Sequence, residues 1–168
     1  MSDLYCDGGV IGRNPSELGG TWAFCIVENN VRKVESSGYI TPDMAVTEVI
    51  TNNLTEMLAL LKGLAELPKD WSGTVYSDSQ VTLGRAFEGW KWKNIPMWMH
   101  ATYQEQRARL VNWDRIEYTL LQGHPTRAEL SRGIGSRGYP VSIHNQWCDK
   151  RCGEMAVKFM GVRGEIRR

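Results

Sequence analysis

Short apolar runs separated by turn residues open the chain and predict strands. Leu4 to Cys6 is one such run, and Gly8-Gly9 follows it with the composition of a turn. Thr21 to Val27 and Val31 to Ile40 are also strand-like, and Glu28-Asn29-Asn30 between them is typical of a hairpin turn. Connections this short join antiparallel neighbours, so the start of the chain predicts three antiparallel strands.

The apolar period then changes from that of a strand to that of a helix. From about Val46 to Leu67, apolar residues recur at the spacing of a helix face, and Pro68 provides a stop. Thr74 to Asp78 is again strand-like, and a helix capped by Asp78 or Ser79 is expected to run to about Phe87. This part of the chain predicts helix, strand and helix.

The second half continues the alternation of helices and strands. Gly89 to Pro96 interrupts the helical pattern, which resumes from Met97 to Val111, and Trp113 to Leu121 predicts a fifth strand. A last helix is expected from about Asn145 to Met160. Helical crossovers join parallel strands, so the order predicts a mixed five-stranded α/β sheet, first antiparallel and then parallel, with helices on both faces.

A turn-rich basic segment at about residues 125–144 separates the fifth strand from the last helix. It contains Arg127, Arg132 and Arg137 among several glycines and prolines, and loops of this length are usually functional or disordered. No linker or internal repeat divides the 168 residues, and this length suits one domain. We therefore expect a single domain over residues 1–168 with a long basic loop.

Composition narrows the class of protein. The chain is 42% hydrophobic and 23% charged, as in globular proteins, and no apolar run approaches the length of a membrane span. The start of the sequence lacks the basic and then apolar pattern of a signal peptide. We therefore expect a cytoplasmic protein with no membrane partner and no obligatory protein partner, which acts as a monomer.

The cysteines fit a reducing compartment. Cys6, Cys25, Cys148 and Cys152 are too few and too scattered to suggest the disulfide framework of a secreted protein. Cys148 and Cys152 could share a metal, but no second Cys or His pair completes a zinc site. Buried thiols are the favoured interpretation, and disulfide pairing stays open.

The net charge of +1 conceals an uneven distribution. Residues 1–88 carry 6 Lys or Arg against 12 Asp or Glu, and residues 89–168 carry 14 against 7, so the halves have formal charges of −6 and +7. An acidic half that holds metal ligands and a basic half together suit a metal-dependent enzyme that acts on a polyphosphate. If the two halves intermix on one surface, however, the asymmetry indicates nothing.

Four acidic residues stand where the expected topology would bring them together. Asp7 and Asp78 end two strand-like runs, Glu56 lies on the long helix, and Asp149 opens the last helix. Ligands bind at the carboxyl ends of neighbouring strands in such sheets. Clustered carboxylates repel one another unless cations lie between them, and hard oxygen ligands select Mg²⁺ or Mn²⁺. Each acid alone could be a surface residue, a cap or a turn former, but together they predict a metal site for phosphoryl chemistry.

Short motifs around these acids occur in a fixed order. They are Asp-Gly-Gly from Asp7, Asn-Asn-x-x-Glu ending at Glu56, Asp-Ser-Gln from Asp78, and Gly-His followed by Asn-x-x-x-Asp ending at Asp149. In this combination the chain resembles ribonuclease H of type 1, over Tyr5 to about Ala156. The resemblance implies a ribonuclease H-like fold and an endonuclease that hydrolyses the RNA strand of RNA/DNA hybrids. It also implies two-metal-ion catalysis with Mg²⁺, for which Mn²⁺ would substitute.

The resemblance also implies roles for single residues. Asp7, Glu56, Asp78 and Asp149 would hold two metal ions, with Asp7 bridging them. His124 would be the mobile loop histidine that moves a proton or helps product leave, and His144 is the alternative for that role. The residues that would contact the hybrid are Gly8, Asn52, Asn53, Gln80, Trp90 and Asn145.

The chain departs from the family pattern in two places. Trp90 and its basic neighbours suit stacking on sugar and pairing with DNA phosphates, although the tryptophans could equally lie in the core. No extended basic handle follows them, so affinity for the hybrid would rely on other arginines. The 24 residues between His124 and Asp149 exceed what many family members use, and Gln146 stands where a Glu is frequent.

Two other functions would share these features. One is another nuclease on the same fold, such as a junction resolvase or a DNA-acting enzyme, and the other is a catalytically inactive module that binds hybrids. Gln80 together with Asn53 favours hybrid recognition, and the presence of all four acids favours catalysis.

Overall fold

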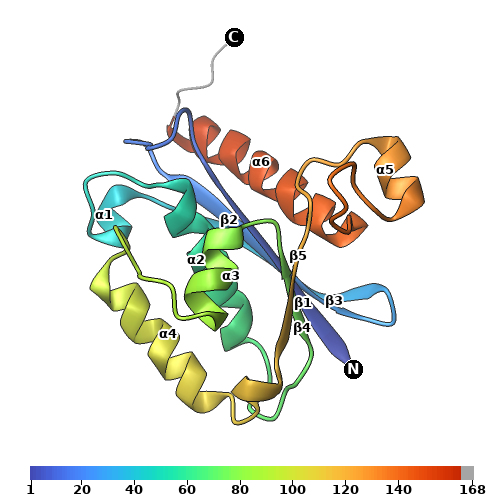
Figure 1. Ribbon diagram of the computed structural model, residues 1–168. Helices are drawn as coiled ribbons and strands as arrows, with labels where there is room; N and C mark the ends of the chain where they lie inside the picture. Colours follow the sequence, from blue (N-terminus) through green and yellow to red (C-terminus); the bar gives the residue numbers. More distant parts are fainter. Residues whose placement is uncertain (164–168) are drawn as a thin grey trace.

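Five strands form one sheet in the computed structural model, which describes residues 1–163 (Figure 1). The expected end of the domain at residue 168 therefore lies outside the described residues. The sheet has the order β3-β2-β1-β4-β5 and consists of β1 (Ser2–Val10), β2 (Gly20–Glu28), β3 (Val31–Ile40), β4 (Thr74–Ser77) and β5 (Glu117–Leu120). β1 pairs antiparallel with β2, and β2 with β3, whereas β1 with β4 and β4 with β5 are parallel. The predicted mixed sheet is confirmed.

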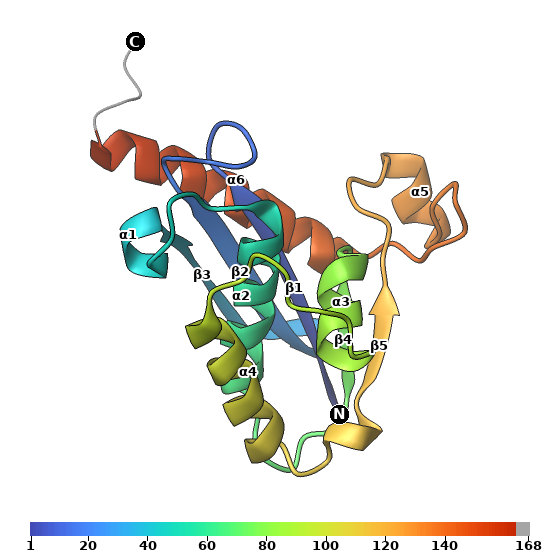
Figure 2. The same ribbon diagram turned by 60° about the vertical axis from the view of Figure 1, so that its left-hand side comes forward.

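Helices cover both faces of the sheet, as predicted (Figures 1 and 2). The helices are α1 (Pro42–Ala45), α2 (Asn52–Ala65), α3 (Gln80–Phe87), α4 (Met97–Arg109), α5 (Arg127–Arg132) and α6 (Ile143–Arg163). α2, α3 and α4 lie on one side of the sheet, and α6 lies across the other (Figure 2). None of the helices in the described part of the chain is long and apolar enough to span a bilayer.

Alternation along β1 and β2 divides the core into two layers. Leu4 and Phe24 belong to the larger core under α2 and α4, whereas their neighbours Tyr5 and Cys25 face α6. Successive strand residues point to opposite faces, so two covered faces require an unbroken apolar run. This is why the predicted strands read as continuous apolar stretches.

β1 is longer than predicted, and Gly8-Gly9 is not a turn. Gly8 pairs with Trp22 and Gly9 with Thr21 inside the strand. A Cβ on Gly8 would lie 2.4 Å from the backbone carbon of Thr55, so only glycine lets α2 pack this closely on β1. Glycine serves turns and close contacts alike, and the sequence alone did not distinguish them.

The long helix begins later than predicted, at Asn52 rather than near Val46. Thr51 caps it by accepting a hydrogen bond from the backbone N–H of Leu54 at 3.1 Å. The preceding residues form the short α1, which ends where Val46 takes a left-handed conformation with φ 58°. The cap of α3 is confirmed at Ser79, whose hydroxyl accepts from the N–H of Thr82 at 3.2 Å.

Three boundaries in the second half also differ from the prediction. β5 is restricted to Glu117–Leu120, because Trp113–Arg115 forms a 3-10 turn in front of it. The expected loop at 125–144 contains α5, whose capping box joins Thr126 and Glu129. α6 starts at Ile143, so Asp149 lies in its second turn and does not open it.

Candidate metal site

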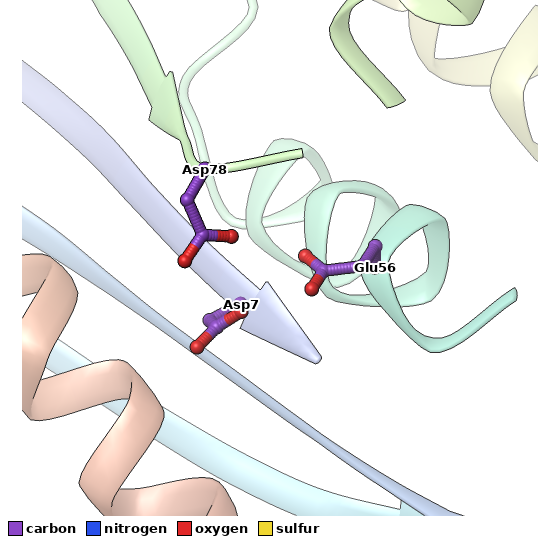
Figure 3. Close-up of side chains that lie close together, drawn as sticks. All are labelled: Asp7, Glu56 and Asp78. Carbon is purple, nitrogen blue, oxygen red and sulfur yellow. The ribbon is translucent and has the colours of Figure 1, made fainter. Parts of the chain in front are cut away.

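Three acids from distant parts of the chain meet at the carboxyl end of β4. Asp7 from β1, Glu56 from α2 and Asp78 after β4 point toward one another (Figure 3), and one oxygen of each lies within 4.8 Å of the others. The parallel register pairs Leu4 with Val75 and Tyr5 with Tyr76. Continued by two residues, this register places Asp78 beside Asp7. Asp7 thus sits inside β1, level with the end of β4, and not at the end of its own strand as predicted.

Glycine brings the helix acid to the strand acid. Gly8 follows Asp7 directly, and the contact of α2 with its bare backbone is at Thr55 and Glu56. The N–H of Gly8 also donates to the Asp7 carboxylate at 2.9 Å. The Asp-Gly pair therefore supplies both the carboxylate and the space for its partner.

Burial raises the pKa of each acid in this trio, and the charges of neighbouring acids raise it further. Asp7 is 3% exposed and Glu56 is 5% exposed. Burial is the main cause of the raised pKa of Asp7, followed by the charge of Asp78. The pKa of Glu56 is raised well above its usual range by burial and then by the charges of Asp7 and Asp78. Burial also raises the pKa of Asp78, which a hydrogen bond from Asn145 partly opposes.

The donor set fits a hard divalent cation. Glu56 Oε2 is buried without a hydrogen-bond partner among the described residues, which is costly for a carboxylate oxygen. A cation bound between the three acids would satisfy this oxygen and cancel their repulsion. Oxygen-only ligands are those that Mg²⁺ and Mn²⁺ prefer.

Asp149 lies on the rim of the same cleft. Its side chain is 45% exposed, and its Oδ2 is 3.4 Å from Nδ1 of His124. It stands outside the trio that meets within 4.8 Å. Its charge nevertheless contributes to the raised pKa of both Asp7 and Asp78. Asp149 is therefore close enough for its charge to act on Asp7 and Asp78.

The structure separates the two candidate histidines. The His124 side chain is 81% exposed at the cleft, and its backbone has a positive φ of 49°. His144 is only 4% exposed, and its ring nitrogens contact Arg32 at 3.0 Å and Asn30 at 2.9 Å. Burial and then the Arg32 charge lower the pKa of His144. His124 is thus placed to meet a substrate, whereas His144 ties α6 to the β2–β3 hairpin.

The predicted substrate contacts fall into two groups. The lining of the cleft includes Gly8, Asn52 and Asn53, and the amide of Asn145 donates to Asp78 at 3.3 Å. Gln80 and Trp90 do not line it. Gln80 is exposed at the first residue of α3, beside the cleft residue Ser79.

Trp90 is held against α3 and is not in the metal cleft. Its ring is so close to Gly84 that a Cβ there would lie 2.2 Å away, although 40% of Trp90 stays exposed. Trp92 is more deeply placed and donates its indole N–H to the carbonyl of Arg85 at 3.2 Å. The tryptophans therefore serve packing, and one face of Trp90 remains free for contacts.

Two residues that the sequence did not single out contact the lining of the cleft, and one of them, Gly123, is itself part of that lining. Asn14 accepts a hydrogen bond from the N–H of Asn52 at 3.0 Å and so fixes the start of α2. Gly123 lies against Asp78, since a Cβ there would be 2.8 Å from its Oδ2. In the sequence, the Asn-Pro pair and the glycine before His124 were the only patterns that could have indicated these two contacts. Both patterns are common in turns, so they did not distinguish a contact at the cleft from a turn.

All four cysteines are free and buried, which confirms the favoured interpretation. Cys148 and Cys152 donate weak hydrogen bonds to the carbonyls of Tyr5 at 3.7 Å and Asp7 at 3.6 Å. Among the described residues, no group that could hold a metal includes a cysteine. These thiols pack α6 against β1 next to the acidic trio.

The family profile and the related sequences both indicate the same protein family. A profile of the family named RNase H matches residues 2–155. A ribonuclease H from Rippkaea orientalis is 34% identical over 162 residues, covering 88% of this chain and 80% of the relative. The N-terminal RNase H domain of a Mycobacterium tuberculosis protein has a similar fold, with a TM-score of 0.65 and 19% identity over 96% of this chain and 97% of that chain.

LC11-RNase H1, isolated from compost and solved in complex with an RNA/DNA hybrid, also has a similar fold. Its TM-score is 0.62 at 19% identity, covering 94% of this chain and 98% of that chain. At such identity, the two solved structures show the shared ribonuclease H-like fold alone.

Proposed function

Because the chain belongs to the ribonuclease H family, we propose that it is an endonuclease that hydrolyses the RNA strand of RNA/DNA hybrids with two divalent cations. Mg²⁺ is the proposed ion, and Mn²⁺ would substitute for it. The observation that carries the proposal is the trio of Asp7, Glu56 and Asp78, of which the first two are buried and Glu56 has one oxygen without a hydrogen-bond partner among the described residues. Such a trio is costly to bury unless cations occupy it.

The four acids of the cleft would share the coordination of two ions. Asp7 is proposed to bridge the ions, because its carboxylate lies close to both Glu56 on α2 and Asp78 after β4. Asp149 on the rim would complete the coordination of the second ion. When bound, the ions supply an activated water and neutralise charge on the scissile phosphate. Asn145 holds the carboxylate of Asp78 in place through its amide.

His124 is proposed to transfer a proton or to help product leave. Its ring is exposed and 3.4 Å from Asp149, so it can reach a group bound at the rim. An imidazole nitrogen can accept or donate a proton, so His124 can exchange one with such a group.

Asn52, Asn53 and Gln80 are proposed to recognise the hybrid. Amides can hydrogen-bond in the minor groove and to the 2′-hydroxyl that distinguishes RNA from DNA. Asn52 and Asn53 line the metal cleft, and Gln80 is exposed next to it. The complex of LC11-RNase H1 with a hybrid supports this substrate class. Gly8 and Trp90 are the remaining proposed contacts.

A panel of labelled substrates tests the proposal. We expect cleavage of the RNA strand of a hybrid with Mg²⁺ or Mn²⁺, and none with EDTA. Duplex DNA, duplex RNA and a four-way DNA junction should stay intact. Cleavage of DNA in the panel would assign the site to another nuclease activity, and binding of the hybrid without cleavage in Mn²⁺ would identify an inactive binding module.

We also propose that the protein acts as a monomer in the cytoplasm. The four buried free cysteines support the compartment, because thiols stay reduced in the cytoplasm. Light scattering on the purified protein would test the monomer, and a dimer mass would contradict it.

A further inference from the structure

The segment between β5 and α6 is a folded lobe, here called the insert (residues 125–142). α5 starts at the capping box of Thr126 and Glu129 and ends at Gly133, which has a positive φ of 78°. Beyond it, Ile134 and Pro140 form an isolated β-bridge. The insert therefore has a defined backbone, although the sequence predicts a loop there.

Glu129 is the internal anchor of the insert. Its carboxylate accepts hydrogen bonds from the N–H of Thr126 at 2.9 Å, the N–H of Ser136 at 2.6 Å and the side-chain amide of Gln122 at 2.8 Å. These bonds lower the pKa of Glu129 to about 2. The only acidic residue of the insert is thus directed inward and bound to the insert itself.

Three arginines point out of this lobe. Arg127, Arg132 and Arg137 are exposed, and none of them forms an ion pair among the described residues. Arg137 lies over the ring of Tyr139, which is itself 39% exposed. The exposed charged side chains of the insert are therefore all positive, and no acidic residue of the insert offsets them.

The insert is joined to the metal cleft at both ends. Its start follows His124, which lines the cleft, and three residues span at most about 11 Å from His124 to Arg127. At its other end the carbonyl of Pro140 accepts from the N–H of Gln122 at 2.9 Å, next to Gly123 and Asp78. α5 accordingly stands beside the carboxyl end of β5 (Figure 2).

We propose that the insert is a second binding surface for the hybrid, on which Arg127, Arg132 and Arg137 contact phosphates next to the scissile one. This inference rests on the proposed function, since it assigns further contacts to the same substrate. Guanidinium groups bind phosphate oxygens in a fixed geometry, and a rigid lobe loses little conformational freedom on binding. The chain has no extended basic handle, and the insert would supply positive charge in its place.

The test compares two triple variants that remove the same charge. Arg127→Gln/Arg132→Gln/Arg137→Gln removes the insert arginines. The control Lys33→Gln/Lys69→Gln/Arg115→Gln removes exposed cations at the amino ends of β3, β4 and β5, far along the strands from the cleft. Both are made in the full chain, and circular dichroism melts check that each variant is folded.

The readouts are KM for hybrid cleavage and the salt dependence of hybrid binding in an Asp7→Asn background. The insert variant should raise KM about tenfold, more than it lowers kcat, and flatten the slope of log K against log salt by about 2–3, since each phosphate contact contributes about 0.9. The control should change KM by less than about twofold and leave the slope unchanged. Arginine-to-lysine replacement at the three insert positions should restore most of the slope, because the charge is kept.

Each outcome is decisive. If the wild-type chain cleaves hybrids but the insert variant matches the control in KM and slope, the insert does not bind the substrate. If the wild-type chain cleaves no hybrid, the proposed function itself fails. A flattened slope in the insert variant alone supports the proposal.

Discussion

Replacing Asp7 by Asn tests whether the acidic trio is a metal site held together against its own repulsion. The amide has the size of the carboxylate, and its oxygen can keep the hydrogen bond from the N–H of Gly8. The change therefore removes one charge and one ligand with little effect on packing. We expect it to abolish hybrid cleavage and to stabilise the metal-free protein.

The size of the stability gain follows from the geometry. Two unit charges 4.8 Å apart, the distance within which the three acids meet, repel by about 3.5 kcal/mol at an effective dielectric constant of about 20. Proton uptake relieves part of this repulsion, so we expect a gain of about 2 kcal/mol in the free energy of unfolding. For a chain of this length, that gain corresponds to a rise of about 4–8 °C in Tm.

The gain should depend on pH in a defined direction. The pKa of Asp7 in the folded state is raised above its ordinary value. The stability linked to the protonated acid is therefore fully present below the ordinary pKa and is lost as pH rises through the raised one. The variant and the wild type should have similar stability at about pH 4, and the advantage of the variant should grow toward about pH 8.

Thermal melts with EDTA and with excess Mg²⁺ provide the measurement. Mg²⁺ should raise the Tm of the wild type and have little effect on the variant, because binding to the folded state stabilises it by mass action. Asp70→Asn is the matched control, since Asp70 is exposed and outside the cleft. The reasoning is refuted if the metal-free wild type is as stable as Asp7→Asn at about pH 8, or if Mg²⁺ stabilises both equally.

Three further variants test single steps of the argument. His124→Ala should slow turnover and leave residual activity, whereas His144→Ala should lower Tm and keep activity per folded molecule. If a cleavage assay shows slowed turnover for His144→Ala alone, His144 has the role proposed for His124. Gly8→Ala should cost about 1–3 kcal/mol in a denaturant titration, because its Cβ would meet backbone at 2.4 Å, and Gly9→Ala, whose nearest contact is 3.4 Å away, should cost less. Glu129→Gln should speed tryptic cleavage after Arg132 and Arg137, since it weakens the hydrogen bonds that order the insert; an unchanged cleavage rate would show that Glu129 is not the anchor.

The sequence by itself determined the features that depend on local pattern. Apolar runs at Leu4 to Cys6 and Thr21 to Val27 predicted strands, and Asp78 or Ser79 was predicted to cap α3, which Ser79 does. The order of the predicted elements, together with the family resemblance, also predicted that Asp7, Glu56, Asp78 and Asp149 would meet; the structure brings the first three within 4.8 Å and leaves Asp149 outside this trio. Local conformation and alternation are encoded by adjacent residues, which is why these predictions agree with the structure.

Only the tertiary structure decided which distant groups touch. It showed that Gly8 is a close-packing site and not a turn, because the partner at Thr55 is 47 residues away along the chain. It also placed His124 at the cleft and His144 in a buried hydrogen-bonded position. The insert became a folded lobe because Glu129 found its donors at Gln122 and Ser136. Contacts between residues far apart in sequence depend on how elements pack, and no local pattern records them.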